Sequence, residues 1–474
     1  MESDANPAAN LRRGLSWNAG SVLTTHGLNF ARYAVVARLL PLDAFGLFAM
    51  ANVAMLGASM LSNWGWRQAF IVQHADSEDP LRRQQSLWTA DLVVCAAATV
   101  LLCALAPLLA RAFGHEALTA LIMASSLYVL GQGLKHPALL LKERNLDFRL
   151  IALVDLSGAV AGLVVAVGAA LAFGNVWALV CGQVASALVP AAVSHLVVRQ
   201  PVRWHLDPAM IGQAYRFSRS IMGMSSLGWV TNQADNAMIG AALGSAALGF
   251  YAIAYRLSEI PKLVQDAVVS RTIYPYYVKA LQRGVGELSQ AWMQTGRFTL
   301  WSLGFAYLPL LLFPELLLTL LFGARWAPAA GALRILALVG LARSLNNFLM
   351  PVFLALQRPQ LDFRIKLAET VIFVACAAYG TWQVGTIEAV AWAGVVSWGL
   401  SFVARFLIVC HLTGARVPPI TLAWRGPLAT LAVLLALTPA WLRLPPLAGL
   451  VAMLVALALA AATLERETLR RWRG

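Results

Sequence analysis

The chain has 474 residues, of which 59% are hydrophobic and only 12% are charged, with a formal net charge of +14. A soluble domain carries roughly 25% charged residues, so this composition excludes an ordinary water-soluble protein. The basic excess does not indicate nucleic-acid binding, because Arg and Lys separate apolar runs instead of gathering on one face. The sequence predicts an all-α polytopic membrane protein, since in lipid the backbone satisfies its own hydrogen bonds as helices.

Fourteen apolar runs follow one another along the chain, each close to the roughly 20 residues that cross a bilayer as a helix. The polar N-terminus has no cleavage-site pattern, which predicts that the first span is an uncleaved anchor. The expected spans are 15–38, 44–66, 86–111, 116–136, 150–173, 175–198, 217–241, 245–271, 297–322, 327–350, 364–384, 386–411, 427–441 and 446–463.

Basic residues in the loops set the expected orientation. With the N-terminus inside, the cytoplasmic loops and tail hold 26 Arg and Lys residues and the opposite side holds 4. Such a bias marks the cytoplasmic side of a membrane protein. We therefore expect both termini in the cytoplasm. The five cysteines all lie in apolar runs without CxxC spacing, which disfavours disulfides and zinc sites.

Three short motifs recur in the same order in the two halves of the chain. L-K-E-R-N-L-D-F-R-L at 141–150 matches L-Q-R-P-Q-L-D-F-R-I at 356–365, Phe113-Gly114 matches Phe322-Gly323, and D-A-F-G-L-F-A-M at 43–50 matches A-A-L-G-F-Y-A-I at 246–253. Their separations are 215, 209 and 203 residues. The repeat predicts two pseudo-symmetric six-helix lobes, at 1–200 and 201–415, followed by two further spans and a basic tail at 416–474. Carriers that work by alternating access use this arrangement, although duplication for stability alone would also explain it.

Ionisable residues inside spans are costly and therefore mark candidate sites. Under the 203-residue offset, Arg32 corresponds to Asp235 and Asn29 to Asn232. These groups either line one cavity or form a structural Arg–Asp pair. The candidate cavity residues are His26, Asn29, Arg32, Asn232, Asp235, Asn236, Arg256, Glu259 and Arg343.

The eighth span carries charges at spacings of three and four, from Arg256 and Glu259 to Lys262 and Asp266, which allow ion pairs within the helix. Pro261 among them predicts a kink. Arg405 is expected to extend to the inner surface and is discounted. Three further carboxylates are expected to be isolated in spans near the cytoplasmic ends: Asp91, Asp155 and Glu369. They could couple transport to a proton or sodium gradient. A position at the membrane boundary would explain their charge equally well.

The two L-D-F-R blocks form a candidate cytoplasmic gate, in which Asp147 and Arg149 of the first repeat correspond to Asp362 and Arg364 of the second. Such charges could exchange partners as the lobes move. Alternatively, Asp caps a helix start and Arg anchors it to anionic lipid headgroups. The anchor is the simpler interpretation.

Several segments together resemble the polysaccharide-transporter branch, the Wzx-type flippases, of the multidrug/oligosaccharidyl-lipid/polysaccharide superfamily. They are L-R-R-G-L-S-W-N-A-G at the first span, R-L-L-P-L-D-A-F-G-L-F-A-M after it, A-L-G-F-Y-A-I-A-Y-R-L in the eighth span and F-G-A-R-W-A-P-A-A before the tenth. The resemblance covers about residues 15–463. It implies alternating access and a cationic cavity, with Arg32 as the clearest positional match.

The resemblance further implies a flippase that moves an undecaprenyl-diphosphate-linked oligosaccharide from the cytoplasmic to the periplasmic leaflet, for exopolysaccharide, capsule or O-antigen synthesis. A multidrug or peptidoglycan-precursor exporter of the same superfamily is the alternative. Arg suits phosphate, because its planar fork binds two oxygens at once. No enzymatic activity, metal or cofactor is expected. The expected partners are the lipid-linked substrate, membrane lipids and a polysaccharide polymerase with its co-polymerase, and no nucleic acid.

Overall fold

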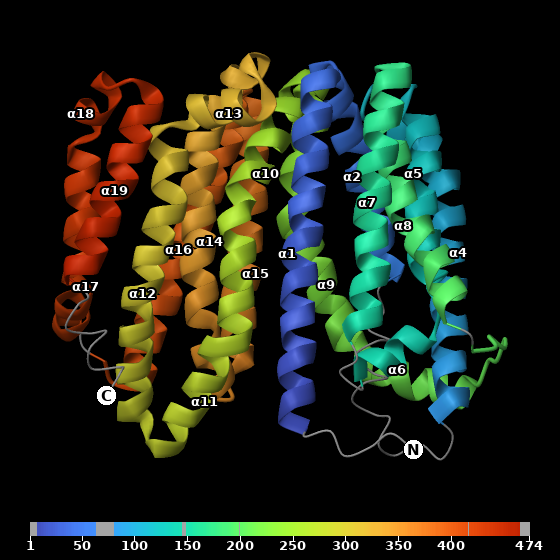
Figure 1. Cartoon of the computed structure of the whole chain (residues 1–474), viewed down its shortest axis with the longest axis horizontal. Coiled ribbons are helices and arrows are strands. Elements are labelled where there is room, and N and C mark those ends of the chain that lie inside the picture. Colours follow the sequence, from blue (N-terminus) through green and yellow to red (C-terminus); the bar gives the residue numbers. More distant parts are fainter. Residues whose placement is uncertain (1–6, 63–79, 145–147, 199, 416, 465–474) are drawn as a thin grey trace. The chain divides into compact units, whose positions relative to one another are not determined.

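The computed structural model describes residues 7–62, 80–144, 148–198, 200–415 and 417–464, and within these ranges it contains helices and no β-strand (Figure 1). The α-helices are α1 (Pro7–Leu39), α2 (Leu42–Ser62), α4 (Pro80–Ala112), α5 (Leu118–Gly133), α6 (Ala138–Arg144), α7 (Phe148–Phe173), α8 (Trp177–Val197), α9 (Pro208–Ala242), α10 (Gly244–Val268), α11 (Tyr274–Arg283), α12 (Val285–Leu312), α13 (Pro314–Phe322), α14 (Ala330–Ala355), α15 (Pro359–Tyr379), α16 (Ile387–Thr413), α17 (Val417–Ala436), α18 (Thr438–Arg443) and α19 (Pro446–Leu464). The predicted all-α class is confirmed.

A helix lies over every predicted span, but not every such helix is uniformly apolar. By length and composition, seven of the described helices can cross a membrane, or eight if the bent pair α12 and α13 is one span. Several of the others, including α10 and α15, do not meet that criterion, and α15 carries four charged residues. The chain is a multi-pass helical membrane protein, and the number fourteen stays a prediction.

The ninth predicted span, 297–322, is not one straight helix. It consists of the end of α12 and the whole of α13, which are bent by 85°. The break lies at Phe313, directly before Pro314. Proline lacks a backbone N–H and disfavours the helical conformation of the residue before it, so the helix cannot continue through this point.

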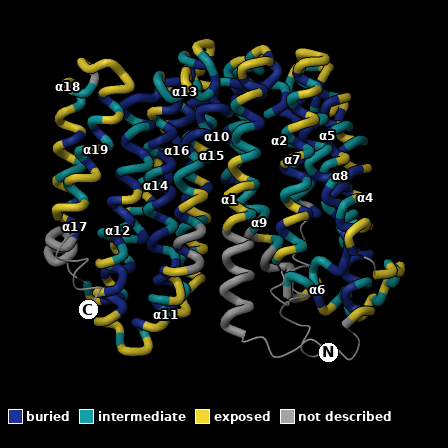
Figure 2. The backbone as a smooth tube through the Cα atoms, in the orientation of Figure 1, coloured by how far each residue is buried: buried dark blue, intermediate teal, exposed yellow. Residues whose placement is uncertain are grey.

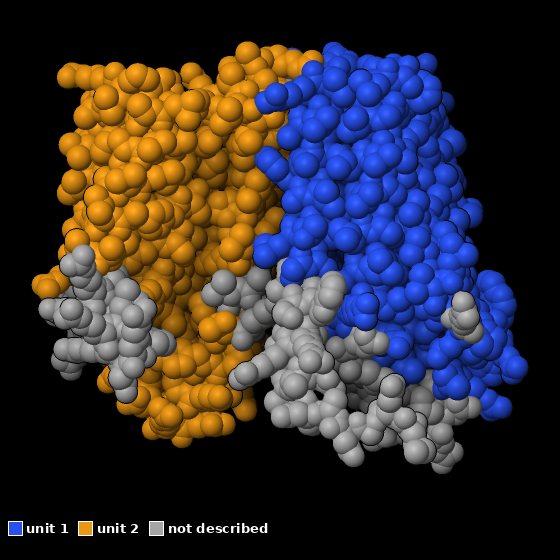
Figure 3. All heavy atoms as spheres, in the orientation of Figure 1, with its two compact units in different colours: residues 1–249 blue, residues 250–474 orange. Residues whose placement is uncertain are grey.

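The chain forms two compact units, Met1–Gly249 and Phe250–Gly474 (Figure 3). Helix α9, which the repeat assigns to the second lobe, belongs to unit 1 because it packs on α2 and α4. A side chain added at Gly57 of α2 would lie 3.1 Å from the Trp229 ring of α9. The predicted lobe boundaries follow the repeat and not this packing, and they stay predictions.

Small residues allow close helix contacts in unit 1. Gly158, Gly162, Ala166 and Ala170 recur every four residues on the buried face of α7, which packs on α8. A Cβ atom at Gly182 of α8 would lie 2.8 Å from the Gly162 carbonyl oxygen. In lipid, where apolar surface gains little from burial, such close backbone packing is the main source of helix association.

Many of the exposed positions along the helices, yellow in Figure 2, carry large apolar side chains. On α19, Leu447, Val451, Val455 and Leu459 recur every four residues and are all more than half exposed. A stripe of this kind is typical of a helix face that contacts lipid hydrocarbon.

Unit 2 has its own buried core, in which Trp292 of α12 packs edge-on against both Phe406 and Trp424.

Two equivalent glycines of the internal repeat, Gly46 and Gly249, lie at one helix contact. A Cβ atom at Gly46 would lie 1.7 Å from the Ser245 carbonyl oxygen, and one at Gly249 would lie 2.9 Å from the Leu42 carbonyl oxygen. The 203-residue offset relates Leu42 to Ser245 as it relates Gly46 to Gly249. The two contacts therefore involve equivalent positions of the repeat.

The turn between α5 and α6 depends on a neutral histidine. His136 Nδ1 accepts a hydrogen bond from the Ala138 N–H at 3.1 Å, so its Nε2 is the protonated nitrogen and donates to the Gln200 carbonyl at 3.2 Å. Burial, and to a lesser degree the neighbouring His195, lowers the pKa of His136 below its ordinary value, against the opposite effect of the Gln200 carbonyl. Protonation at Nδ1 would break the bond to Ala138.

Replacement of Gly46 by alanine is expected to destabilise the protein, because the new methyl group collides with backbone and not with a movable side chain. We expect a loss of about 1–3 kcal/mol, seen as a lower thermal unfolding temperature of the purified protein. Gly168→Ala is the control, since nothing lies within 4 Å of its added Cβ. Equal unfolding temperatures for the two variants would contradict the close contact.

Acidification is expected to weaken the α5–α6 turn. The folded-state pKa of His136 lies below the unfolded one, so the unfolded state takes up the proton first. Stability is then complete above the ordinary pKa of 6.5 and is lost as the pH falls below it. Thermal unfolding between about pH 7.5 and about pH 5.5 should show this loss, and His136→Asn should reduce it. An unchanged pH dependence in the variant would refute the assignment.

Candidate functional site

The buried arginine of α1 contacts unit 1's own core. Arg32 is 6% exposed, its Nη1 donates to the Gly182 carbonyl at 3.3 Å, and its Nη2 donates to the Tyr33 hydroxyl at 3.1 Å. Its guanidinium carbon lies 4.8 Å from the centre of the Tyr33 ring. A Cβ atom at Gly162 would lie 2.7 Å from Nη1, so the α7–α8 contact has room for this group only because residue 162 is glycine.

The structural Arg32–Asp235 pair is not formed. Among the described residues, the hydrogen bonds of Arg32 go to neutral oxygens, and Asp235 of α9 is 2% exposed and accepts from the Asn236 backbone N–H at 2.8 Å. The offset relates positions in the repeat, and it carries no information on which way the side chains point.

The other unit 1 candidates are more accessible. His26 is exposed and Asn29 is half-buried on α1. On α9, Asn232 and Asn236 are half-buried and donate within their own helix, to the Gly228 carbonyl at 2.8 Å and to Gln233 Oε1 at 3.3 Å. These four residues stay candidates for contact with a substrate.

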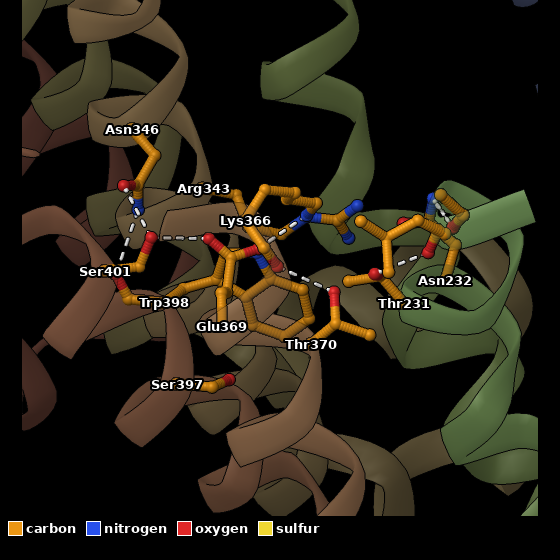
Figure 4. Close-up of polar contacts among 12 residues, drawn as sticks. Thr231, Asn232, Arg343, Asn346, Lys366, Glu369, Thr370, Ser397, Trp398 and Ser401 are labelled. Carbon is orange, nitrogen blue, oxygen red and sulfur yellow. Dashed lines mark hydrogen bonds and ion pairs between the residues drawn. The ribbon is translucent and has the colours of Figure 1, made fainter. Parts of the chain in front are cut away.

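Unit 2 contains an ion pair between two of the predicted residues. Arg343 Nη1 of α14 donates to Glu259 Oε1 of α10 at 2.7 Å and to the Tyr255 hydroxyl at 2.5 Å. The Arg343 guanidinium carbon also lies 5.0 Å from the centre of the Trp398 ring of α16 (Figure 4). Glu259 therefore pairs with another helix and not within its own.

A second cluster of charges in unit 2 surrounds Arg405, which was discounted from the sequence. Arg405 of α16 is 4% exposed, its Nε donates to Asp362 Oδ1 at 2.7 Å, and its Nη1 donates to Glu369 Oε2 at 3.1 Å. The prediction that Arg405 extends to the membrane surface is wrong. The two carboxylates on α15 hold its guanidinium inside unit 2.

Glu369 is likewise not an isolated boundary carboxylate. It is 2% exposed and lies near the middle of α15. Besides Arg405, it accepts from Lys366 Nζ at 2.5 Å on Oε1 and from the Ser401 hydroxyl at 2.5 Å on Oε2. The Asn346 side chain of α14 completes the cluster by accepting from Arg405 Nη1 at 2.7 Å. Asp155 also has a partner, because its carboxylate lies 3.7 Å from Lys135 Nζ.

The cations and carboxylates of this interior balance each other. Three cations, Arg343, Lys366 and Arg405, share three carboxylates. The carboxylates are Glu259, Asp362 and Glu369. Neutral pairing lowers the large cost of charges away from water. Sequence spacing could have found part of this cluster, since positions 362, 366 and 369 share one face of α15.

Part of the cluster is accessible. We call the half-buried residues Tyr255, Glu259, Asn347 and Lys366, together with Arg343, the polar face of unit 2. Further along α10, Lys262 pairs with Asp266 at 2.9 Å, which confirms the predicted pair within that helix, and Asp266 also accepts from Asn347. Arg256 is half-buried on the same helix.

The candidate gate stays a prediction, because one of its four residues lies outside the described residues. Asp147 lies outside them, Arg149 and Arg364 are exposed, and Asp362 is bonded to Arg405. Exchange of partners during transport stays a prediction. Within the described residues no group of three His, Cys, Asp or Glu side chains could hold a metal ion.

Comparison with known proteins adds a family and a fold. The family described as polysaccharide biosynthesis protein matches residues 35–331, more than half of the chain. The chain is 26% identical to the succinoglycan biosynthesis transport protein ExoT of Rhizobium meliloti, over 82% of this chain and 78% of the relative. It is 25% identical to the lipopolysaccharide biosynthesis protein WzxC of Escherichia coli, over 79% of this chain and 76% of the relative.

A solved structure shares the fold. The lipid II flippase MurJ in an inward closed conformation aligns with a TM-score of 0.72 and 10% identity, over 95% of this chain and 99% of that one. At this identity the likeness concerns the fold alone. It agrees with the helical membrane class expected from the sequence.

Removal of Arg405 is expected to destabilise unit 2 strongly, because Arg405→Ala leaves Asp362 and Glu369 without their shared cation. The loss should be about 3–5 kcal/mol, the usual cost when one partner of a buried pair is removed. Thermal unfolding of the purified protein measures it, with the exposed Arg283→Ala as control. Unfolding of Arg405→Ala at the wild-type temperature would show that the cluster contributes little.

Proposed function

Because the chain belongs to the polysaccharide biosynthesis protein family, we propose that it is a flippase for a lipid-linked oligosaccharide. Its cargo is an oligosaccharide joined to undecaprenyl diphosphate, which it moves from the cytoplasmic to the periplasmic leaflet by alternating access. The observation that carries the proposal is the similarity to ExoT and WzxC over about four-fifths of the chain, since both names belong to polysaccharide biosynthesis and one of them to transport.

The chemistry of the interior supports a polar cargo. Charged side chains inside membrane helices mark a substrate path or a relay, because lipid alone would not maintain them. Arg343 and Lys366 offer cations on the polar face of unit 2, as an anionic diphosphate requires. A flippase does not break bonds in its cargo, which is why we infer no enzymatic activity.

An exporter of another cargo in the same superfamily is the second candidate. The fold likeness to the lipid II flippase favours a peptidoglycan precursor as its cargo. Sequence similarity favours the first proposal, because the relatives with more than 20% identity carry polysaccharide names. Both cargoes share an isoprenoid diphosphate, so the polar face alone does not distinguish them.

The cellular setting follows from the proposal. We place the protein in the bacterial inner membrane with both termini in the cytoplasm, beside a polysaccharide polymerase and co-polymerase that consume the flipped product. Coupling to a proton or sodium gradient would supply the driving force. No organic cofactor takes part.

Reconstitution tests the proposal. The purified protein in vesicles should expose an undecaprenyl-diphosphate-linked oligosaccharide, labelled in its sugar, to an impermeant glycosidase added outside. Without protein the rate should be far lower, because the sugar crosses lipid very slowly. Ethidium in parallel vesicles reports on drug export. Ethidium movement without sugar movement would replace the proposal with the exporter, and movement of lipid II alone would identify the peptidoglycan precursor.

A further inference from the structure

The polar face of unit 2 contains a cation that differs from its neighbours in how firmly it is held. Lys366 has one carboxylate partner, Glu369, and its side chain is 33% exposed. Arg405 has two carboxylate partners and a side chain that is 5% exposed. The two cations share Glu369, but only Lys366 faces accessible space.

The exposed part of Lys366 does not lie on the lipid face of α15. The exposed apolar residues Phe363, Leu367 and Val371 recur every four residues and form that lipid face. Lys366 lies about 100° around the helix from the middle of this stripe, on the same side as the buried Glu369. A half-exposed ammonium on this side requires water or a polar ligand, because lipid hydrocarbon would not solvate it.

Lys366 also does not extend to the membrane surface. It lies about 10 Å along α15 from the first residue of the helix, a distance that a lysine side chain could partly span toward the helix start. Its Nζ instead bonds Glu369, one turn further into the helix. Nζ has three N–H groups, and among the described residues only this one hydrogen bond uses them.

Glu369 would stay neutralised if Lys366 left it. Its Oε2 accepts from Arg405 at 3.1 Å and from Ser401 at 2.5 Å, independently of the bond on Oε1. The separation of Lys366 from Glu369 therefore leaves no isolated buried charge. An isolated buried charge would have too high a free-energy cost for this exchange. Lys366 is the cation of this cluster that can change partner at low cost.

A second cation lies next to Lys366. Lys366 Nζ is 5.9 Å and the Arg343 guanidinium carbon 5.0 Å from the centre of the same Trp398 ring (Figure 4). A diphosphate carries at least two negative charges and binds best between two cations. Arg343 offers a planar fork and Lys366 a mobile point charge, and the two forms of contact are complementary.

We infer that Lys366 exchanges Glu369 for the diphosphate of the lipid-linked substrate and binds it together with Arg343. The inference rests on the proposed function and assigns the phosphate contact to unit 2 instead of to Arg32. The resting ion pair thus acts as a reversible substitute for the ligand. Departure of the cargo returns Lys366 to Glu369.

Binding to the purified full-length protein in phosphatidylcholine nanodiscs tests the inference, with undecaprenyl diphosphate as the probe and undecaprenol as the uncharged comparison. Lys366→Gln should weaken diphosphate binding about tenfold or more, the usual effect of losing a charge-assisted hydrogen bond. Its unfolding temperature should stay close to wild type, unlike that of Arg405→Ala, because Glu369 keeps Arg405. Lys366→Arg should retain most of the binding, and Lys279→Gln, which replaces an exposed lysine of α11, is the matched control.

The outcomes separate the two proposals. Wild-type protein that binds undecaprenol as well as the diphosphate would refute the proposed function. A wild type that prefers the diphosphate, with Lys366→Gln binding it equally well, would overturn the present inference alone. A large loss of thermal stability in Lys366→Gln would show a structural pair and overturn it too. Competition by phosphatidylglycerol in the nanodiscs at equal strength would assign the contact to lipid headgroups.

Discussion

The carboxylate of Glu369 is buried inside the helical bundle of unit 2 and is neutralised by Lys366 and Arg405. An ionised carboxylate away from water is tolerable only with such partners. Arg405 belongs to α16 and also reaches Asn346 on α14, so one buried charge fixes three helices against each other. Such a buried charge adds to close backbone packing in selecting a single register, because lipid hydrocarbon packs on apolar helices as readily as another helix does.

The sequence was sufficient for the fold class and for the places of the helices, because an apolar run of the length of a bilayer has few other structures open to it. It also selected Glu259 and Arg343, which the structure joins at 2.7 Å. It failed for Arg405 and Glu369, because distance from a helix end is a poor measure of burial. Their partners lie on different helices, and only tertiary packing shows that Asp362, Glu369 and Arg405 meet.

Arg32 is a second example of a residue whose side-chain contacts the sequence did not reveal. Its guanidinium lies against α7 and α8, with Gly182 and Tyr33 as partners, and its predicted place in a substrate cavity stays a prediction. The clue in the sequence was the row of small residues that contains Gly162, since a close helix contact leaves carbonyl oxygens accessible to a long side chain from a third helix. A repeat relates backbone positions, whereas side-chain direction depends on which neighbour offers space.

The charges of unit 2 therefore differ in the number of oppositely charged partners that each one holds, and not only in sign. Arg405 neutralises two carboxylates at once, and its loss would leave both without this shared cation. Lys366 neutralises Glu369, which Arg405 also neutralises. The departure of Lys366 therefore changes the electrostatic energy of the cluster least. A carrier must be neutral when empty, to be stable in lipid, and cationic when an anion arrives. The shared carboxylate of Glu369 meets both conditions. It pairs with Lys366 when the carrier is empty, and Arg405 still neutralises it when Lys366 binds the ligand.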